Sequence, residues 1–237
     1  ETGIFTSSDK AVNPTNVMGT TKLMGERLMT AANSSKRENG PIFSSTRFGN
    51  VLGSNGSVIP IFRNQILKGG PVTLTDKNMT RFIMSVEEAV KLVLDSVIEA
   101  RGGEVFVTKM PVMRIEDLAI AMIEELSPEG VNITEIGSKP GEKLYEELMS
   151  DEETRRTIEL DKFFSVLPAF RGIYSDIQYD YPKIVSELVK DPYVSEQQTS
   201  MTVVEVKAFL RDNKLLFDSS VEEQSARYWP GDKEEKS

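Results

Sequence analysis

Residues 7–22 read SSDKAVNPTNVMGTTK, and this stretch decides how the chain is interpreted. A short apolar strand predicted at residues 4–6 precedes it, and the turn signal Asn13-Pro14 introduces a helix predicted over residues 15–32. The charged pair Asp9-Lys10 therefore lies just past the carboxyl end of a strand. In open α/β sheets this is the edge where ligands bind, so the pair is a candidate for a functional site.

Met18 and Lys22 fall one turn apart on one face of the predicted helix. That face and the Asp9-Lys10 pair can meet over a single crevice. Taken separately, each feature has an ordinary structural explanation: a solvated Asp-Lys ion pair, and a core methionine beside a surface lysine. Only their occurrence in one string favours a functional interpretation.

Strands alternate along the chain with helices of ten or more residues, which indicates a mainly parallel sheet covered by helices. A capping box at Ser85 and Glu88 introduces the clearest helix, whose apolar residues fall on one face. After about residue 150 the alternation fades. Further strands are predicted at residues 42–48, 71–74, 104–107 and 132–136, and further helices at residues 57–67, 85–99, 114–126, 143–149 and 202–212.

Composition excludes several classes of function. The 237 residues carry a net charge of -9 and no dense Lys/Arg cluster, so nucleic acid is not an expected partner. No apolar run reaches the roughly 18 residues that span a bilayer, and no signal peptide opens the sequence. Cysteine and histidine are both absent, which excludes disulfides, Ser-His-Asp triads and His-metal sites. We therefore expect a cytoplasmic enzyme without a metal site, whose proton transfers use Asp, Glu, Lys, Tyr or water.

The string at residues 7–22 closely resembles the active-site segment of the UDP-N-acetylglucosamine 4,6-dehydratases, extended short-chain dehydrogenases of polysaccharide biosynthesis. The resemblance continues through RFGNVLGSNGSVIPIF (47–62), LTDKNMTRFIMSVEEAVKLV (74–93) and KPGEKLYEELMSDEET (139–154). Met18 stands at the tyrosine position of the Tyr-x-x-x-Lys signature. Methionine at this position also occurs within the family, and the chain looks like the branch that makes capsule precursors and inverts C5 during dehydration.

The resemblance covers roughly residues 4–160 and implies an α/β fold. It implies the C-terminal part of a Rossmann-like parallel sheet over residues 1–109, with a substrate-binding insertion at about 52–80. A smaller α/β substrate-binding region follows at residues 110–180. The C-terminal extension, residues 181–237, is a candidate latch onto a neighbouring subunit, since family members form dimers or hexamers, although its helix could equally pack on its own domain.

The resemblance also implies a chemistry. Family members hold NADP (or NAD), oxidise a UDP-sugar at C4, eliminate water across C5 and C6, and return the hydride to C6. By carry-over Lys10 is the base at C5 and Asp9 is the acid at C6, and either Ser8 or Ser7 hydrogen-bonds a sugar hydroxyl. Lys22 holds the nicotinamide ribose. Met18 cannot carry a proton, so it is expected to pack against the ligands, and Lys10, Asp9 or a water takes over the tyrosine's role.

The remaining site residues follow from the same matched strings. Ser7, Phe48 and Asn50 are expected on the cofactor side, with Asn50 also beside the sugar. Ser57 and Val58 begin a helix whose free backbone N–H groups suit the nucleotide.

Three further residues complete the expected substrate site. Arg81 matches the arginine that binds the diphosphate, a task for which its planar donors suit it. Lys139 stands where the wider family often has arginine, and Glu142 would accept from ribose hydroxyls.

One expected feature of the family is missing. No strand followed by a Gly-x-x-Gly-x-x-Gly turn, which would cradle the cofactor pyrophosphate, occurs in the chain. Gly49, Gly53 and Gly56 have a different spacing and follow the catalytic segment. We therefore expect the second part of a longer protein, with an exposed strand edge and exposed apolar helix faces. The alternatives are a UDP-sugar epimerase or reductase of the same superfamily, and an inactive substrate-binding or assembly fragment.

Overall fold

The computed structural model describes residues 1–37, 39–53, 58–127, 129–137, 142–169 and 177–216. Its centre is a six-stranded sheet in the order β1-β2-β6-β11-β10-β12. The first three strands, β1 (Thr2–Ser8), β2 (Ile42–Phe48) and β6 (Val105–Thr108), run parallel. The other three, β11 (Phe163–Val166), β10 (Thr157–Leu160) and β12 (Ile184–Ser186), continue the sheet with antiparallel pairing. The predicted α/β fold is confirmed.

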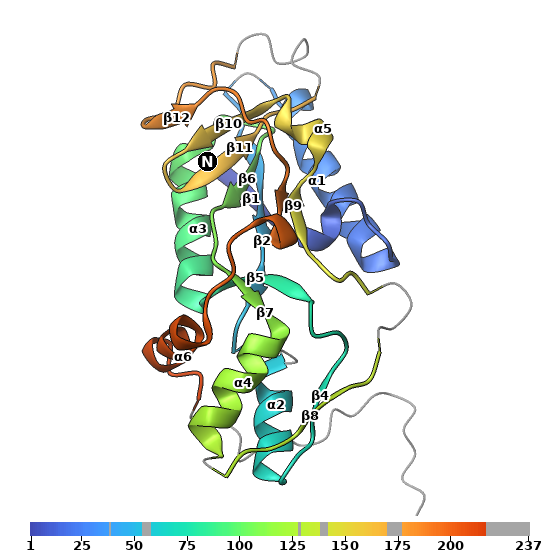
Figure 1. Cartoon of the computed structure of the whole chain (residues 1–237). Helices are drawn as coiled ribbons and strands as arrows, with labels where there is room; N and C mark the ends of the chain where they lie inside the picture. The colour runs from blue at the N-terminus through green and yellow to red at the C-terminus, as the bar shows by residue number, and fades with distance from the viewer. Residues whose placement is uncertain (38, 54–57, 128, 138–141, 170–176, 217–237) are drawn as a thin grey trace, which may run out of the picture.

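Two helices lie on opposite sides of the parallel strands, as Figure 1 shows. Helix α1 (Val17–Ser35) begins at Asn16, whose side chain accepts a hydrogen bond from the Gly19 N–H. It packs closely on β1, which is possible because Gly25 has no Cβ. A Cβ at this position would lie 2.3 Å from an atom of the Phe5 ring. Helix α3 (Val86–Glu99) begins with the predicted capping box.

A buried ion network joins α1, β2 and the short helix α5 (Asp151–Thr154). The Arg47 guanidinium donates to both carboxylate oxygens of Glu26 and of Glu153, at 2.8 to 2.9 Å. It also donates to the carbonyl of Leu148 at 2.9 Å. Every donor of this buried arginine faces an acceptor, so the network fixes α1 against the sheet.

A second group of elements forms the lower part of the molecule in Figure 1. Helices α2 (Val58–Leu67) and α4 (Ile115–Leu126) share one apolar core with β4 (Val72–Leu74), which pairs with β8 (Ile133–Glu135). Helix α6 (Val203–Asp212) packs on α4 of the same chain through Val206 and Leu210. Two ion pairs, Lys207 with Glu124 and Arg211 with Glu125, strengthen this contact.

Short strands connect the two parts. β5 (Thr80–Met84) lies between β3 (Asn50–Val51) and β7 (Val112–Arg114). β9 (Glu147–Met149) pairs with β13 (Tyr193–Val194), which leads into the 3-10 turn η3 (Ser195–Gln197). The helix predicted over residues 143–149 is therefore wrong, because pairing with β13 buries Leu148 and Met149 in a strand.

The apolar face predicted for α3 is largely exposed. Val86, Val90, Leu94 and Ile98 are all exposed, whereas the helix buries Leu92 and Ser96 toward the sheet. β1 lies at the edge of the sheet, with β2 as its one neighbour among the described strands. Both features agree with the expectation of exposed docking faces. In the described part of the chain, no helix has the length and apolar character needed to cross a membrane.

Candidate active site

The Asp9-Lys10 pair forms a 3-10 turn, η1 (Asp9–Ala11), at the carboxyl end of β1. The Ser8 hydroxyl caps this turn by accepting from the Lys10 backbone N–H at 3.2 Å. Lys10 Nζ donates to Asp9 Oδ1 at 3.0 Å and to Oδ2 at 3.3 Å. The Asp9 side chain is buried, while that of Lys10 is 40% exposed. The pair thus joins a sheltered carboxylate to an accessible amine.

Helix α1 presses directly on this turn. A Cβ on Gly19 would lie 2.2 Å from the Lys10 carbonyl oxygen, so only glycine permits the approach. Lys22 Nζ donates to the Thr6 carbonyl at 3.0 Å and lies 5.4 Å from the centre of the Phe5 ring. Met18, one turn earlier, is 55% exposed and packs little against the protein.

A cavity of about 620 Å³ lies between the sheet and the α2–α4 region. Its wall includes eight residues predicted for the site: Ser7, Ser8, Lys22, Phe48, Asn50, Val58, Arg81 and Glu142. Apolar side chains from α2, β5 and α4 line much of the remainder, together with threonines of the β4 segment. Asp9, Lys10 and Met18 do not line the cavity, although Asp9 directly follows Ser8, which does. Ser57 and Lys139 lie outside the described residues.

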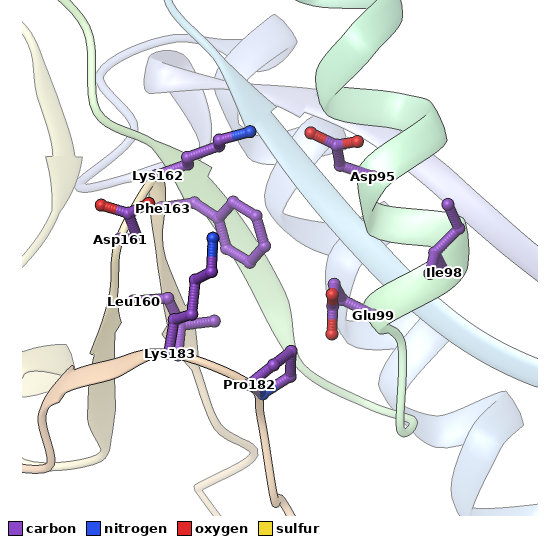
Figure 2. A pocket seen from close by; sticks show the side chains of 9 residues that line it. All are labelled: Asp95, Ile98, Glu99, Leu160, Asp161, Lys162, Phe163, Pro182 and Lys183. Carbon is purple, nitrogen blue, oxygen red and sulfur yellow. The ribbon is translucent and has the colours of Figure 1, made fainter.

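A smaller hollow of about 200 Å³ lies elsewhere, between the end of α3 and the β10–β11 hairpin. Figure 2 shows Asp95 and Glu99 of α3 on the side of the helix toward Phe163 and Lys183, with Ile98 on the same helix. None of the predicted site residues lines this hollow. The larger cavity is therefore the candidate active site.

Glu146 is a buried carboxylate of this site that the sequence analysis missed. Its two oxygens accept from Asn50 Nδ2 at 2.7 and 2.8 Å, and one accepts from the Phe82 backbone N–H at 2.9 Å. Burial raises its pKa to about 7, and the charge of Asp9 acts in the same direction. Arg81, Asn50 and Lys10 oppose that rise.

Arg81 lies beside Glu146, with Nε 3.5 Å from Glu146 Oε1. Its other nitrogens donate to three backbone carbonyls, those of Thr80, Lys143 and Leu144, at 2.8 to 3.2 Å. The guanidinium is therefore held in a fixed position on the cavity wall. An arginine held in this way can place its permanent positive charge against a ligand in the cavity without first losing side-chain freedom.

Ser195, in the C-terminal extension, supports Glu146 from behind. Its hydroxyl accepts from the Glu146 backbone N–H at 2.8 Å, and its own N–H donates to the Glu146 carbonyl at 2.8 Å. The same hydroxyl lies 2.8 Å from Thr80 Oγ1. All three residues are buried, so η3 holds the segment that carries Glu146 against β5.

The residues expected to hold a nicotinamide fit that group. The Ser7 hydroxyl is buried on the cavity wall and has no hydrogen-bond partner among the described residues, so it offers a donor and an acceptor to a ligand. Lys22, Phe48 and Asn50 line the same cavity. Together they provide an aromatic ring, a cation and two polar groups suited to a ribosyl nicotinamide.

Residues 1–168 match the family described as polysaccharide biosynthesis protein. The chain belongs to this family. The matched residues include the whole of β1, η1 and α1, and every described element through β11.

The curated relatives have several names. A protein of Methanocaldococcus jannaschii named as an uncharacterized membrane protein is 55% identical over 171 residues, covering 70% of this chain and 51% of its own length. An inverting UDP-N-acetylglucosamine 4,6-dehydratase of Campylobacter jejuni is 40% identical over 73% of this chain and 51% of its own length. A UDP-glucose 4-epimerase of Rickettsia canadensis is 37% identical over 87% of this chain and 60% of its own length. The chain thus spans about half the length of these relatives.

Solved structures include a similar protein, Pen from Bacillus thuringiensis. It is 39% identical, and its TM-score is 0.81 over 91% of this chain and 63% of its own length. At this identity and coverage the likeness extends beyond the sheet to the lower region and part of the C-terminal extension.

Proposed function

We propose that this chain carries the catalytic and substrate-binding part of a UDP-N-acetylglucosamine 4,6-dehydratase that inverts C5 and serves surface polysaccharide synthesis. One observation carries the proposal. A buried aspartate and an accessible lysine are in contact at the carboxyl end of β1, directly after Ser8, which lines the cavity. The relative in Campylobacter jejuni, named as an inverting dehydratase of this kind, supports the same substrate.

Elimination of water requires one base and one acid, and the Asp9-Lys10 pair can supply both. Moving one proton from Lys10 Nζ to Asp9 across the 3.0 Å contact converts the ion pair into a free amine and a carboxylic acid. The amine then takes the proton from C5, whose acidity a 4-ketone raises. The released electron pair forms the C5–C6 double bond, the C6–O bond breaks, and Asp9 protonates the oxygen that leaves as water. The step ends with a protonated lysine and an ionised aspartate, which is the original ion pair.

A nicotinamide cofactor, NADP or NAD, would supply the hydride chemistry at C4 and C6 when bound. Ser7, Lys22, Phe48 and Asn50 would hold it on the cavity wall. Met18 has no proton to give, so removal of the 4-hydroxyl proton falls to Lys10, Asp9 or a water. We assign Met18 a packing role, since its exposed side chain is free to cover the ligands.

The UDP-sugar would occupy the remainder of the cavity. Arg81 is proposed to bind the diphosphate, and Glu142 the uridine ribose. Val58, at the start of α2, offers backbone N–H groups to the nucleotide, and Ser57 and Lys139 are proposed to contribute beside it. Ser8 is proposed to bind a sugar hydroxyl next to the catalytic pair.

Incubation with UDP-N-acetylglucosamine and either cofactor tests the proposal. NMR and mass spectrometry should detect a product that has lost one water and gained a C6 methyl group. Lys10→Ala should abolish this product while UDP-sugar binding persists. Lys68→Ala, at an exposed lysine after α2, is the matched control and should leave turnover unchanged. Turnover at the wild-type rate in Lys10→Ala would refute the assigned mechanism.

A second candidate is a UDP-sugar 4-epimerase, which the Rickettsia relative favours by its longer match. Epimerisation needs no acid at C6, so it leaves the Asp9-Lys10 contact without a use. A 4-epimer with its C6 hydroxyl intact, as the sole product, would establish this alternative and exclude the dehydratase.

A further inference from the structure

Glu146 is a buried carboxylate that the proposed elimination does not use. It is 3% exposed and comes from the segment before β9, far in the sequence from the residues it contacts. It contacts Asn50 of β3 and, on β5, both the Arg81 side chain and the Phe82 backbone. A carboxylate is costly to bury, so this placement needs a reason beyond packing.

The segment that carries Glu146 is fixed against the catalytic turn. Lys143 Nζ donates to the Val12 carbonyl at 2.8 Å, and Asn13 Nδ2 donates to Glu147 Oε2 at 2.7 Å. These contacts flank Glu146 on both sides in the sequence. Together with Ser195 behind it, they leave the carboxylate little freedom to move away from η1.

The charged groups that face Glu146 are Asp9 and Lys10 from η1 and Arg81 from β5; Asn50 and Ser195 are uncharged. Asp9 acts on Glu146 more strongly than Lys10 does. Electrostatic coupling between two sites is reciprocal. An ionised Glu146 therefore disfavours the negative charge of Asp9 more than it favours the positive charge of Lys10.

We propose that Glu146 is a positioning residue that holds Asn50 and Arg81 in place and, when ionised, favours transfer of a proton from Lys10 to Asp9. In this transfer an N–H bond of Lys10 breaks, an O–H bond of Asp9 forms, and both groups become neutral. No other reactant is needed. The catalytic consequence rests on the proposed dehydratase function, because the transfer produces the amine and the acid that elimination uses.

The electrostatic part can be tested without turnover. In protein labelled with ¹³C at the glutamate side-chain carboxyls, Glu146 is the signal lost in Glu146→Gln, and it should titrate near pH 7. Asp9→Asn should move this midpoint down by about one pH unit, the size expected for a nearby like charge. The Glu104 carboxyl, buried at the far end of β6, is the control in the same sample and should not respond. An unchanged Glu146 midpoint would overturn the proposal.

The catalytic part is tested by the pH dependence of kcat. In the wild type kcat should fall as the pH drops through about 7, where Glu146 takes up a proton. Glu146→Gln should lower kcat about tenfold at pH 8, with little change in KM, and should lose this dependence. Glu146→Asp, which keeps the charge, should restore part of the dependence. Glu104→Gln, which neutralises another buried carboxylate, should retain the wild-type profile.

The two measurements distinguish failure of the proposed role of Glu146 from failure of the proposed dehydratase function. A wild-type profile in Glu146→Gln would overturn the proposed role of Glu146 and leave the dehydratase function intact. Absence of a dehydrated product from the wild type would refute the function, and the Glu146 midpoint in Asp9→Asn would still decide the coupling.

Discussion

Arg47→Met is expected to destabilise the protein strongly at neutral pH and much less in acid. Burial would raise the pKa of Glu153, but attraction and hydrogen bonds from Arg47 outweigh burial and lower that pKa to about 2. Relative to the ordinary value of 4.5, this shift corresponds to about 3 kcal/mol of stability. The variant also leaves Glu26 and Glu153 without their common partner, and breaking a buried pair costs about 3 to 5 kcal/mol.

The lowered pKa of Glu153 determines how the stability of the wild type and of the variant changes with pH. A carboxyl whose pKa is lowered by folding stabilises the protein above pH 4.5, and this stability is lost as the pH falls toward 2. The wild type therefore loses stability in that range. In Arg47→Met the two carboxyls that have lost Arg47 gain from protonation, so the free energy of unfolding of the variant rises over the same range.

Urea unfolding at pH 7 and pH 3 measures both effects. The free energy of unfolding should be about 3 to 5 kcal/mol lower in Arg47→Met at pH 7, with a smaller difference at pH 3. Adding Glu26→Gln and Glu153→Gln should recover much of the loss at pH 7, because no buried charge then remains unpaired. An equal difference at both pH values would refute the electrostatic explanation.

Three further substitutions or deletions test other parts of the structure. Gly19→Ala should abolish product formation and lower the melting temperature, because its Cβ would displace the Lys10 carbonyl; retained activity would contradict the close approach seen here. Ser195→Ala should cost about 1 to 3 kcal/mol in urea unfolding, since it leaves the buried Glu146 N–H without an acceptor. Deletion from Val203 onward should leave the number of subunits, determined by light scattering, unchanged, because α6 packs on α4 of its own chain; a smaller number of subunits would establish the subunit latch.

Elements with strong local signals could be predicted from the sequence. β2 has the predicted bounds, and the capping box at Ser85 introduces α3 as expected. In both cases the deciding interactions lie within a few residues of one another. The string at residues 7–22 likewise placed Asp9 and Lys10 at the end of a strand, where the structure has them.

Features that depend on distant partners could not be predicted. The residues around Leu144 and Leu148 have a spacing that also suits a helix, and only pairing with β13 makes residues 147–149 a strand. Glu146 stands in a matched string, yet nothing local distinguishes it from Glu147. Its neighbours Asn50 and Arg81, which line the candidate site, are brought to it by the folding of the whole chain.

The contact between Ser195 and Glu146 also has a consequence during synthesis. Asp9 leaves the ribosome before Ser195, the residue that supports Glu146. At roughly 5 to 20 residues per second, the interval between them is about 10 to 40 s. Throughout that interval the candidate site is incomplete, because Asp9 and Lys10 have been made but the residue that holds the Glu146 segment has not.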